Sequence, residues 1–221
     1  MAEARAASAR RARPARRPGE RRSHAERKAE TRARLIAAVV ESIAETGLAR
    51  TTAPEIARRA GVTWGAVQHH FGGKDGMLVA VLDDSFRRFA ALMETIPLEG
   101  TSIEERAALF IDRAWQHFSS PHYRSTYEIL LHYLGREEKR RGGAGGDWRE
   151  RMFGAWDALW QRLFGGTRLP RSRHYVLQHY TISVLSGLAS TLMLEGSEAS
   201  IRPRELELLN ETLTRELARG A

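Results

Sequence analysis

The sequence predicts an all-α protein, with a small three-helix unit near its N-terminus and a larger helical region after it. Apolar residues beyond about residue 25 recur at spacings of three and four, which is the period of a helix with one buried face. Gly and Pro residues divide this pattern into segments, and no alternating pattern of a β-strand stands out. No run of about 18 apolar residues occurs, so we expect no membrane-spanning helix.

The excess positive charge of the chain is concentrated at its N-terminus. Residues 1–28 contain ten Lys and Arg against three acidic residues, a net charge of +7, whereas the whole chain carries +8. Residues 1–24 hold almost no large apolar side chain, so we predict a disordered, Arg-rich arm. Contact with DNA phosphates or a minor groove is one role for it. A solvated tail, a start site placed too early and an organelle transit peptide are the alternatives.

Two absences narrow the cellular setting that we expect. The chain has no cysteine, which excludes disulfides and cysteine-ligated metal sites. Residues 1–30 lack the apolar centre of a secretory signal. We therefore expect a cytoplasmic protein.

The N-terminal unit begins with two helices whose ends are marked by caps and stops. The first runs from about Ala25 to Thr46, and Gly47 is expected in the left-handed stop position. Thr52 and Glu55 have the spacing of a capping box at the start of a second helix. This helix is about eight residues long and ends at Gly61.

Later helices follow from the same signals. Thr63 is the predicted N-cap of a third helix, from Trp64 to about Phe71, which two glycines break. A long helix follows from about Lys74 into the mid-90s. Residues 141–146 predict a flexible loop, and further helices are predicted at about 102–119, 121–136, 147–164, 171–195 and 204–218.

Two short helices joined by a glycine-containing turn, after a longer helix, are typical of a helix-turn-helix unit. In such a unit the second short helix presents its outer face to the major groove of DNA. If Val67 and Phe71 face the core, a helical wheel at about 100° per residue gives the outward surface. Its members are Trp64, Gly65, Ala66, Gln68 and His69.

The chemistry of these side chains suits DNA. Gln68 can pair with adenine, and Trp64 offers an apolar face to a thymine methyl group. His70 and Lys74 are placed for phosphate contacts. The spacing alone also fits a small helical bundle whose exposed residues have no role in binding.

The run from Thr51 to Lys74, TTAPEIARRAGVTWGAVQHHFGGK, resembles the DNA-binding domain of the tetracycline-repressor (TetR) family, and the resemblance extends over residues 27–85. It implies a DNA-binding domain at 25–75 and a helical effector-binding and dimerisation domain at 76–221. It also implies phosphate contacts from Thr52, His70 and Lys74, with Trp64, Gly65 and Gln68 nearest the bases. The family usually has Tyr where this chain has Gln68, so that position departs from the pattern.

Two C-terminal helices are candidates for a dimer interface. Residues 171–195 are apolar on several faces, and residues 204–218 carry a leucine stripe at Leu206, Leu209, Leu213 and Leu217. We expect them to form a symmetric four-helix interface, as the family does, that places two reading helices on a palindromic site. An intramolecular core pair is the alternative.

Aromatic residues crowd the middle helices, where the family holds an effector pocket. The candidate lining residues are Trp115, Tyr127, His132 and Trp156, and a small, partly hydrophobic effector is expected. The sequence has no zinc-hydrolase, P-loop or dinucleotide motif in a suitable context, so neither catalysis nor a cofactor or metal is predicted. The predicted function is a ligand-responsive repressor. The alternative is a helical small-molecule-binding or interaction protein with weak or lost DNA specificity.

Overall fold

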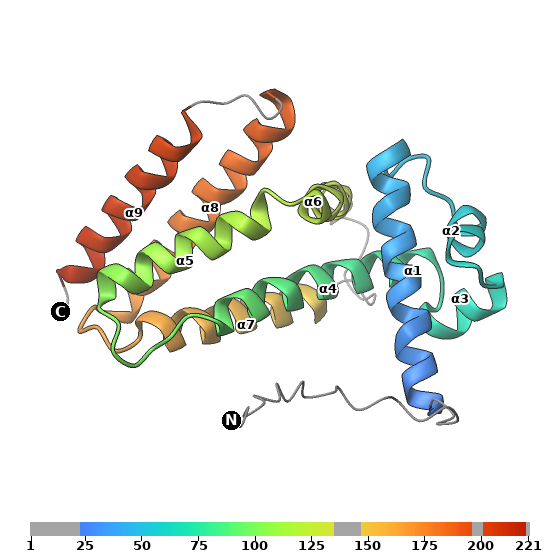
Figure 1. Ribbon diagram of the computed structural model, residues 1–221, viewed down its shortest axis with the longest axis horizontal. Coiled ribbons are helices and arrows are strands. Elements are labelled where there is room, and N and C mark those ends of the chain that lie inside the picture. The colour runs from blue at the N-terminus through green and yellow to red at the C-terminus, as the bar shows by residue number, and fades with distance from the viewer. Residues whose placement is uncertain (1–22, 135–146, 196–200, 220–221) are drawn as a thin grey trace, which may run out of the picture.

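The computed structural model describes residues 23–134, 147–195 and 201–219 (Figure 1). These residues form nine helices and no strand. The predicted loop at 141–146 and residues 1–22 of the predicted arm lie outside these residues. The all-α class is confirmed. The helices are α1 His24–Thr46, α2 Ala53–Ala60, α3 Trp64–Phe71, α4 Lys74–Glu94, α5 Ile103–Phe118, α6 Pro121–Leu134, α7 Asp147–Phe164, α8 Arg171–Glu195 and α9 Arg202–Ala218.

The first helix begins slightly earlier than predicted. Ser23 is its N-cap, and the Ser23 hydroxyl accepts a hydrogen bond from the Glu26 amide at 3.1 Å. The Glu26 carboxylate accepts in turn from the Ser23 amide at 2.7 Å, which completes a capping box. Ser23 and His24 therefore belong to this helix and its cap, and the predicted arm of residues 1–24 is too long by these two residues. At the other end, Gly47 stops the helix as predicted and has a positive φ of 79°, but its ψ of 158° is extended, so it does not adopt the αL conformation.

Two hydrophobic cores organise the helices, and α4 contributes to both. The N-terminal core joins α1, α2 and α3 to the first half of α4, including Met77, Leu78 and Val81. The C-terminal core joins the second half of α4, including Phe89 and Met93, to α5, α7, α8 and α9. The N-terminal core thus extends past residue 75, the boundary that we predicted between the DNA-binding and the C-terminal domain.

Helix α6 connects the two parts of the molecule. Its Ser125 hydroxyl donates to the Val40 carbonyl of α1 at 3.0 Å, and its Glu128 carboxylate accepts from the Leu48 amide at 3.0 Å. Tyr133 donates to a carbonyl in the first turn of α4 at 3.2 Å. These contacts reach the end of α1, the loop after it and the start of α4. Any shift of α6 therefore acts on the N-terminal unit directly.

Helices α8 and α9 lie side by side, on the far side of the molecule from α2 and α3 (Figure 1). Leu209, Leu213 and Leu217 of α9 are at most 2% exposed, because they pack into the C-terminal core, where α9 contacts α5. These leucines therefore belong to a core within one chain, which was the alternative to a dimer interface. Among the described residues, no helix combines the length and apolar character needed to cross a bilayer.

Candidate DNA-binding surface and inner cavity

Helix α2 is held against α1 by three buried apolar side chains, Ile56, Ala57 and Ala60. The helix ends at Gly61, as predicted, and Gly61 adopts the left-handed conformation with φ 64° and ψ 38°. The Val62 amide then donates to the Ala57 carbonyl at 3.0 Å, which turns the chain toward α3. This short turn fixes the angle between the two short helices.

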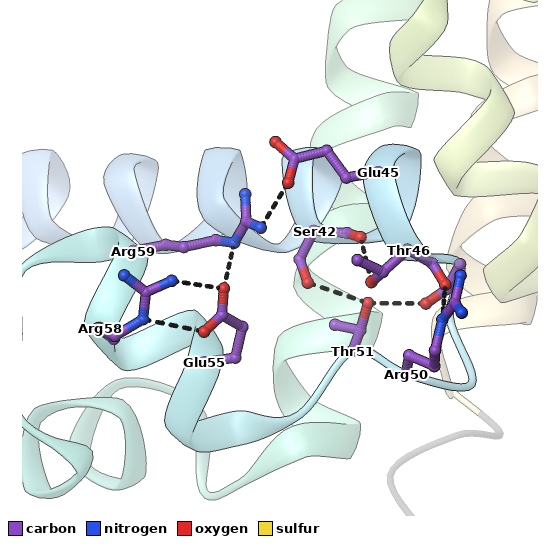
Figure 2. Close-up of polar contacts among 9 residues, drawn as sticks. Ser42, Glu45, Thr46, Arg50, Thr51, Glu55, Arg58 and Arg59 are labelled. Atoms are coloured by element: carbon purple, nitrogen blue, oxygen red, sulfur yellow. Dashed lines mark hydrogen bonds and ion pairs between the residues drawn. The ribbon is translucent and has the colours of Figure 1, made fainter.

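The entrance to α2 differs from the prediction. Thr52 occupies the N-cap position, but its side chain makes no capping hydrogen bond, so the predicted capping box with Glu55 is wrong. The preceding residue, Thr51, is fully buried, and its hydroxyl donates to the Gly47 carbonyl at 3.0 Å. It lies 3.2 Å from the Ser42 hydroxyl, from which it accepts (Figure 2). Thr51 ties the α1–α2 loop to α1, and Thr52 stays exposed.

Glu55 takes part in an ion-pair network instead of a cap (Figure 2). Its carboxylate binds Arg58 at 2.8 Å and Arg59 at 2.7 Å, and Arg59 reaches Glu45 of α1 at 2.5 Å. Hydrogen bonds from Arg58 and Arg59 lower the pKa of Glu55 to about 2. Because the network is at the surface, its main effect is to orient α2 against α1 rather than to stabilise the fold.

Helix α3 has one buried face and one exposed face. The Thr63 hydroxyl accepts from the Ala66 amide at 3.3 Å, so the predicted N-cap is confirmed. Val67 is 0% exposed, while Trp64 is 45% exposed at the first turn. Gly65, Gln68 and His69 are also exposed, and Ala66 is half-buried at the flank. The predicted outward direction of this face is confirmed, and α2 and α3 lie at one end of the molecule (Figure 1).

Two of the predicted contact residues are already hydrogen-bonded within the chain. The Gln68 side-chain amide donates to the Gly72 carbonyl at 3.2 Å, across the end of α3. The Lys74 ammonium donates to the Thr51 carbonyl at 2.5 Å. An ammonium has three donors, so Lys74 can hold this carbonyl and still reach a phosphate. The Gln68 amide likewise has a second N–H and an acceptor oxygen in addition to the N–H that Gly72 accepts, so both can still be offered to a base.

His70 lies at the boundary between the exposed face and the core. It is half-buried, and burial lowers its pKa, with smaller contributions from His69, Lys28 and Arg32. Arg32 of α1 also covers the ring of Phe71, with its guanidinium carbon 4.8 Å from the ring centroid. Burial therefore favours the neutral form of the His70 imidazole, and an anion bound beside it would favour the charged form.

Sequence reasoning missed three contributors to this surface. These are Thr51, the Glu45–Arg59 pair and the Arg32 contact with Phe71. The spacing of Glu55 with Arg58 and Arg59, three and four residues on, is a helix ion-pair signal that points to part of the network. The Glu45–Arg59 and Arg32–Phe71 contacts join residues that are distant in sequence, and the contacts of Thr51 to Gly47 and Ser42 span a loop, so no helical or capping spacing marks them.

A second feature of the molecule is a cavity of about 120 Å³ among α4, α5, α6, α7 and α8. Its aromatic walls are Phe86, Phe89, Phe118, Tyr123 and Trp156. Its polar lining consists of Ser85, His117, Thr126 and Ser186, and four aliphatic side chains complete it: Leu82, Leu130, Met152 and Ile182.

The cavity includes one of the four predicted lining residues, Trp156. Tyr127 lies beside it, with its ring centroid 6.1 Å from that of Tyr123. Trp115 packs under Arg202, whose guanidinium carbon is 5.6 Å from the indole centroid. His132 packs against Tyr133, away from the cavity lining. The structure therefore does not bring the four predicted residues together around this cavity.

The cavity is uncharged. No Asp, Glu, Lys or Arg is among its lining residues. Burial lowers the pKa of His117 to about 4, so its imidazole is neutral at pH 7. The Ser85 hydroxyl lies 3.4 Å from His117 Nε2, and the Tyr123 hydroxyl lies 3.5 Å from that of Ser186. Within the described residues, no cluster of acidic or His side chains has the arrangement of a metal site.

Comparison with known sequences places the N-terminal unit in a defined family. Residues 35–81 match the model of the bacterial regulatory proteins of the tetR family. HTH-type transcriptional regulator BetI 1 of Chromohalobacter salexigens is 49% identical over 51 residues, which is 23% of this chain and 25% of that protein. HTH-type transcriptional regulator BetI of Escherichia coli O17:K52:H18 is 30% identical over 187 residues, covering 67% of this chain and 93% of that protein.

Solved structures share the fold over most of the chain. A transcriptional regulator from Rhodococcus sp. Rha1 has a TM-score of 0.61 and 23% identity, covering 86% of this chain and 95% of that one. The multidrug binding protein EbrR, in complex with imidazole, has a TM-score of 0.59 and 23% identity, covering 88% and 94%. With the helix-turn-helix geometry described above, these matches show that the chain belongs to the TetR family of DNA-binding transcriptional regulators.

Proposed function

We propose that the protein is a ligand-responsive repressor that binds a palindromic operator as a homodimer in the cytoplasm. Residues 25–75 would supply the DNA contacts, and residues 76–221 the effector site and the dimer interface. The observation that carries the proposal is the exposed face of α3, an eight-residue helix fixed at its N-cap and on its buried side.

The contacts with DNA follow from the position of each residue on α3 and around it. Trp64, Gly65 and Gln68 would lie nearest the bases, because they are exposed on the first two turns. Ala66 and His69 flank this face. Thr52 and Thr63 lie at the starts of α2 and α3, where helix N-termini attract phosphates, and His70 and Lys74 would add further phosphate contacts.

Helices α8 and α9 support the homodimer. Their outer face exposes large apolar side chains on both helices: Val176 at 53%, Tyr180 at 42%, Leu194 at 86% and Leu208 at 61%. Ser183 and Gly187, also exposed on α8, allow a second helix to approach closely. An exposed apolar surface of this kind favours association with a second copy. Two copies double the base contacts, each of which contributes only about 1–3 kcal/mol.

The two faces of α6 support the ligand response. Tyr123, Thr126 and Leu130 line the inner cavity, whereas Ser125 and Glu128 hold α1 and the loop after it. Helix α4 likewise carries cavity residues in its middle and Lys74 at its start. A ligand that favours another position of α6 or α4 would alter the spacing of the two α3 helices. The ligand then shifts a population between two dimers rather than blocking DNA directly.

Selection of bound sites from random DNA, followed by fluorescence titration of the full chain, tests the proposal. We expect enrichment of a two-fold symmetric site. Trp64→Ala and Gln68→Ala should lose preference for this site, while Lys74→Ala should weaken all sequences alike and lower the salt slope by about 1. Absence of any enriched sequence would favour the alternative of a helical small-molecule-binding protein that has lost DNA specificity.

The N-terminal arm is tested separately. Removal of residues 1–22 leaves the Ser23 cap of α1 in place. If the arm contacts DNA, its loss should reduce both affinity and salt dependence, because phosphate contacts release counterions. If DNA affinity and its salt dependence stay unchanged, the arm is a tail without contact to DNA.

A further inference from the structure

We propose that the inner cavity takes a neutral, single-ring aromatic molecule that carries one hydroxyl group. This inference deepens the ligand response proposed above and rests on it. Four properties of the described lining carry it: volume, aromatic walls, lack of charge and a stretched polar pair.

The volume limits the ligand to about one ring. The cavity measures about 120 Å³. A cavity of about 150 Å³ in a protein interior is known to hold benzene. A two-ring ligand exceeds this volume, so its second ring would either stay outside the cavity or force the close-packed helices apart.

The walls favour a flat π system. Phe89 and Trp156 have ring centroids 4.4 Å apart, and Phe86 lies 6.5 Å from Trp156. Their planes are tilted by 34° and 57°, so the walls are themselves a cluster of packed rings. Aromatic pairs prefer offset or edge-to-face contacts at such distances. An aromatic ligand can satisfy these contacts, whereas an aliphatic chain of equal size gains only burial.

The electrostatics of the cavity exclude charged ligands. No charged side chain lines it, and the neutral His117 is buried among Phe89, Phe118 and Tyr123 at centroid distances of 5.4, 5.7 and 5.4 Å. A carboxylate or ammonium would lose its hydration without gaining an opposite charge. A neutral form of the ligand is therefore strongly preferred.

A polar pair provides the anchor for a hydroxyl group. Ser85 and His117 both line the cavity, and their 3.4 Å separation is longer than an ordinary hydrogen bond. A ligand hydroxyl is both a donor and an acceptor, so it can bond to one or both of these atoms. Ser85 belongs to α4, the helix that begins with Lys74 at the DNA-binding surface, which links this anchor to that surface.

The test measures binding of five probes to the full chain by calorimetry and thermal shift, without DNA. Phenol should bind with a Kd on the order of 0.1 mM, within the limit on binding energy per atom for a small ligand. Toluene, which lacks the hydroxyl, should bind about 5- to 10-fold more weakly. Benzoate, benzylamine and 1-naphthol should bind at least about 100-fold more weakly. Tighter binding of any of these last three than of phenol, or no binding of phenol, would overturn the inference.

Two variants locate the anchor. Ser85→Ala should weaken phenol about 5-fold and leave toluene unchanged, because it removes one hydroxyl partner. Tyr127→Phe is the matched control, since Tyr127 lies beside the cavity but does not line it, and neither probe should change. An equal loss of phenol and toluene in Ser85→Ala would contradict the anchor. The probe series on the unmodified chain remains decisive if Ser85→Ala does not fold.

Addition of DNA separates this inference from the proposed function. If phenol binds as expected but leaves affinity for the selected DNA unchanged, the ligand class stands and the ligand response fails. If a charged or two-ring probe releases DNA and phenol does not, the ligand response stands and the inferred class is overturned.

Discussion

Thr51 and Thr52 are adjacent, chemically identical residues for which the structure predicts opposite effects. Thr51→Val keeps the shape of the side chain but removes its hydroxyl, which donates to the Gly47 carbonyl at 3.0 Å and contacts the Ser42 hydroxyl at 3.2 Å. Each buried hydrogen bond contributes about 1 kcal/mol net, so we expect a loss of about 2 kcal/mol in the free energy of unfolding. Urea titration of the full chain, followed by circular dichroism, measures this loss.

Thr52→Val is the matched control. The Thr52 side chain is exposed and makes no capping hydrogen bond, so the free energy of unfolding should change by less than about 0.5 kcal/mol. If Thr52 contacts a phosphate, the same variant should instead weaken binding to all DNA sequences. Equal destabilisation by the two variants, or a larger effect of Thr52→Val, would refute the assignment of the structural role to Thr51.

Three further predictions concern titration and packing. Burial holds the pKa of His117 near 4, whereas in the unfolded chain it titrates near 6.5, so the contribution of His117 to stability is fully present above pH 6.5 and is lost as the pH drops from 6.5 to 4. The loss that comes from His117 amounts to about 3 kcal/mol, and His117→Gln should remove it from the profile measured by urea titration. Burial also lowers the pKa of His70, and a bound phosphate would raise it. DNA affinity should therefore increase as the solution is acidified from neutral pH, and His70→Gln should reduce that increase. Val67→Ala should cost about 1–3 kcal/mol of unfolding free energy because Val67 is fully buried, and a change below about 0.5 kcal/mol would show that α3 is not packed as described.

Much of the DNA-binding surface could be predicted from sequence because its signals are local. Thr63 caps α3, Gly61 and Gly72 end the short helices in the left-handed conformation, and Val67 sets the buried face. Each of these signals lies within a few residues of the element that it determines. The outward face of α3 follows from the helical period alone.

Two causes explain the misassigned residues: a local ion pair that competes with a predicted cap, and packing between distant segments. A Thr-x-x-Glu spacing predicts a capping box at Thr52, but Glu55 is drawn away by Arg58 and Arg59. The inner cavity needs five helices, so an aromatic residue in the right region, such as Trp115, can still face elsewhere.

The leucine stripe of α9 also shows what a sequence pattern leaves undetermined. Its spacing predicts a buried face, and Leu209, Leu213 and Leu217 are buried. The pattern does not say whether a helix of the same chain or of a second copy covers that face. Here the second half of the molecule packs against it, so a partner would meet Leu208 and the outer face of α8 instead.

The central claim is that α3 reads the major groove twice, once from each subunit. Footprinting of the selected operator with hydroxyl radicals, combined with protection of guanine N7 from methylation, tests it directly. We expect two symmetric protected patches on the DNA, with N7 protection in the major groove and centres about 34 Å apart or a multiple of that distance. A single asymmetric patch, or full binding without any N7 protection at a guanine-containing half-site, would contradict it.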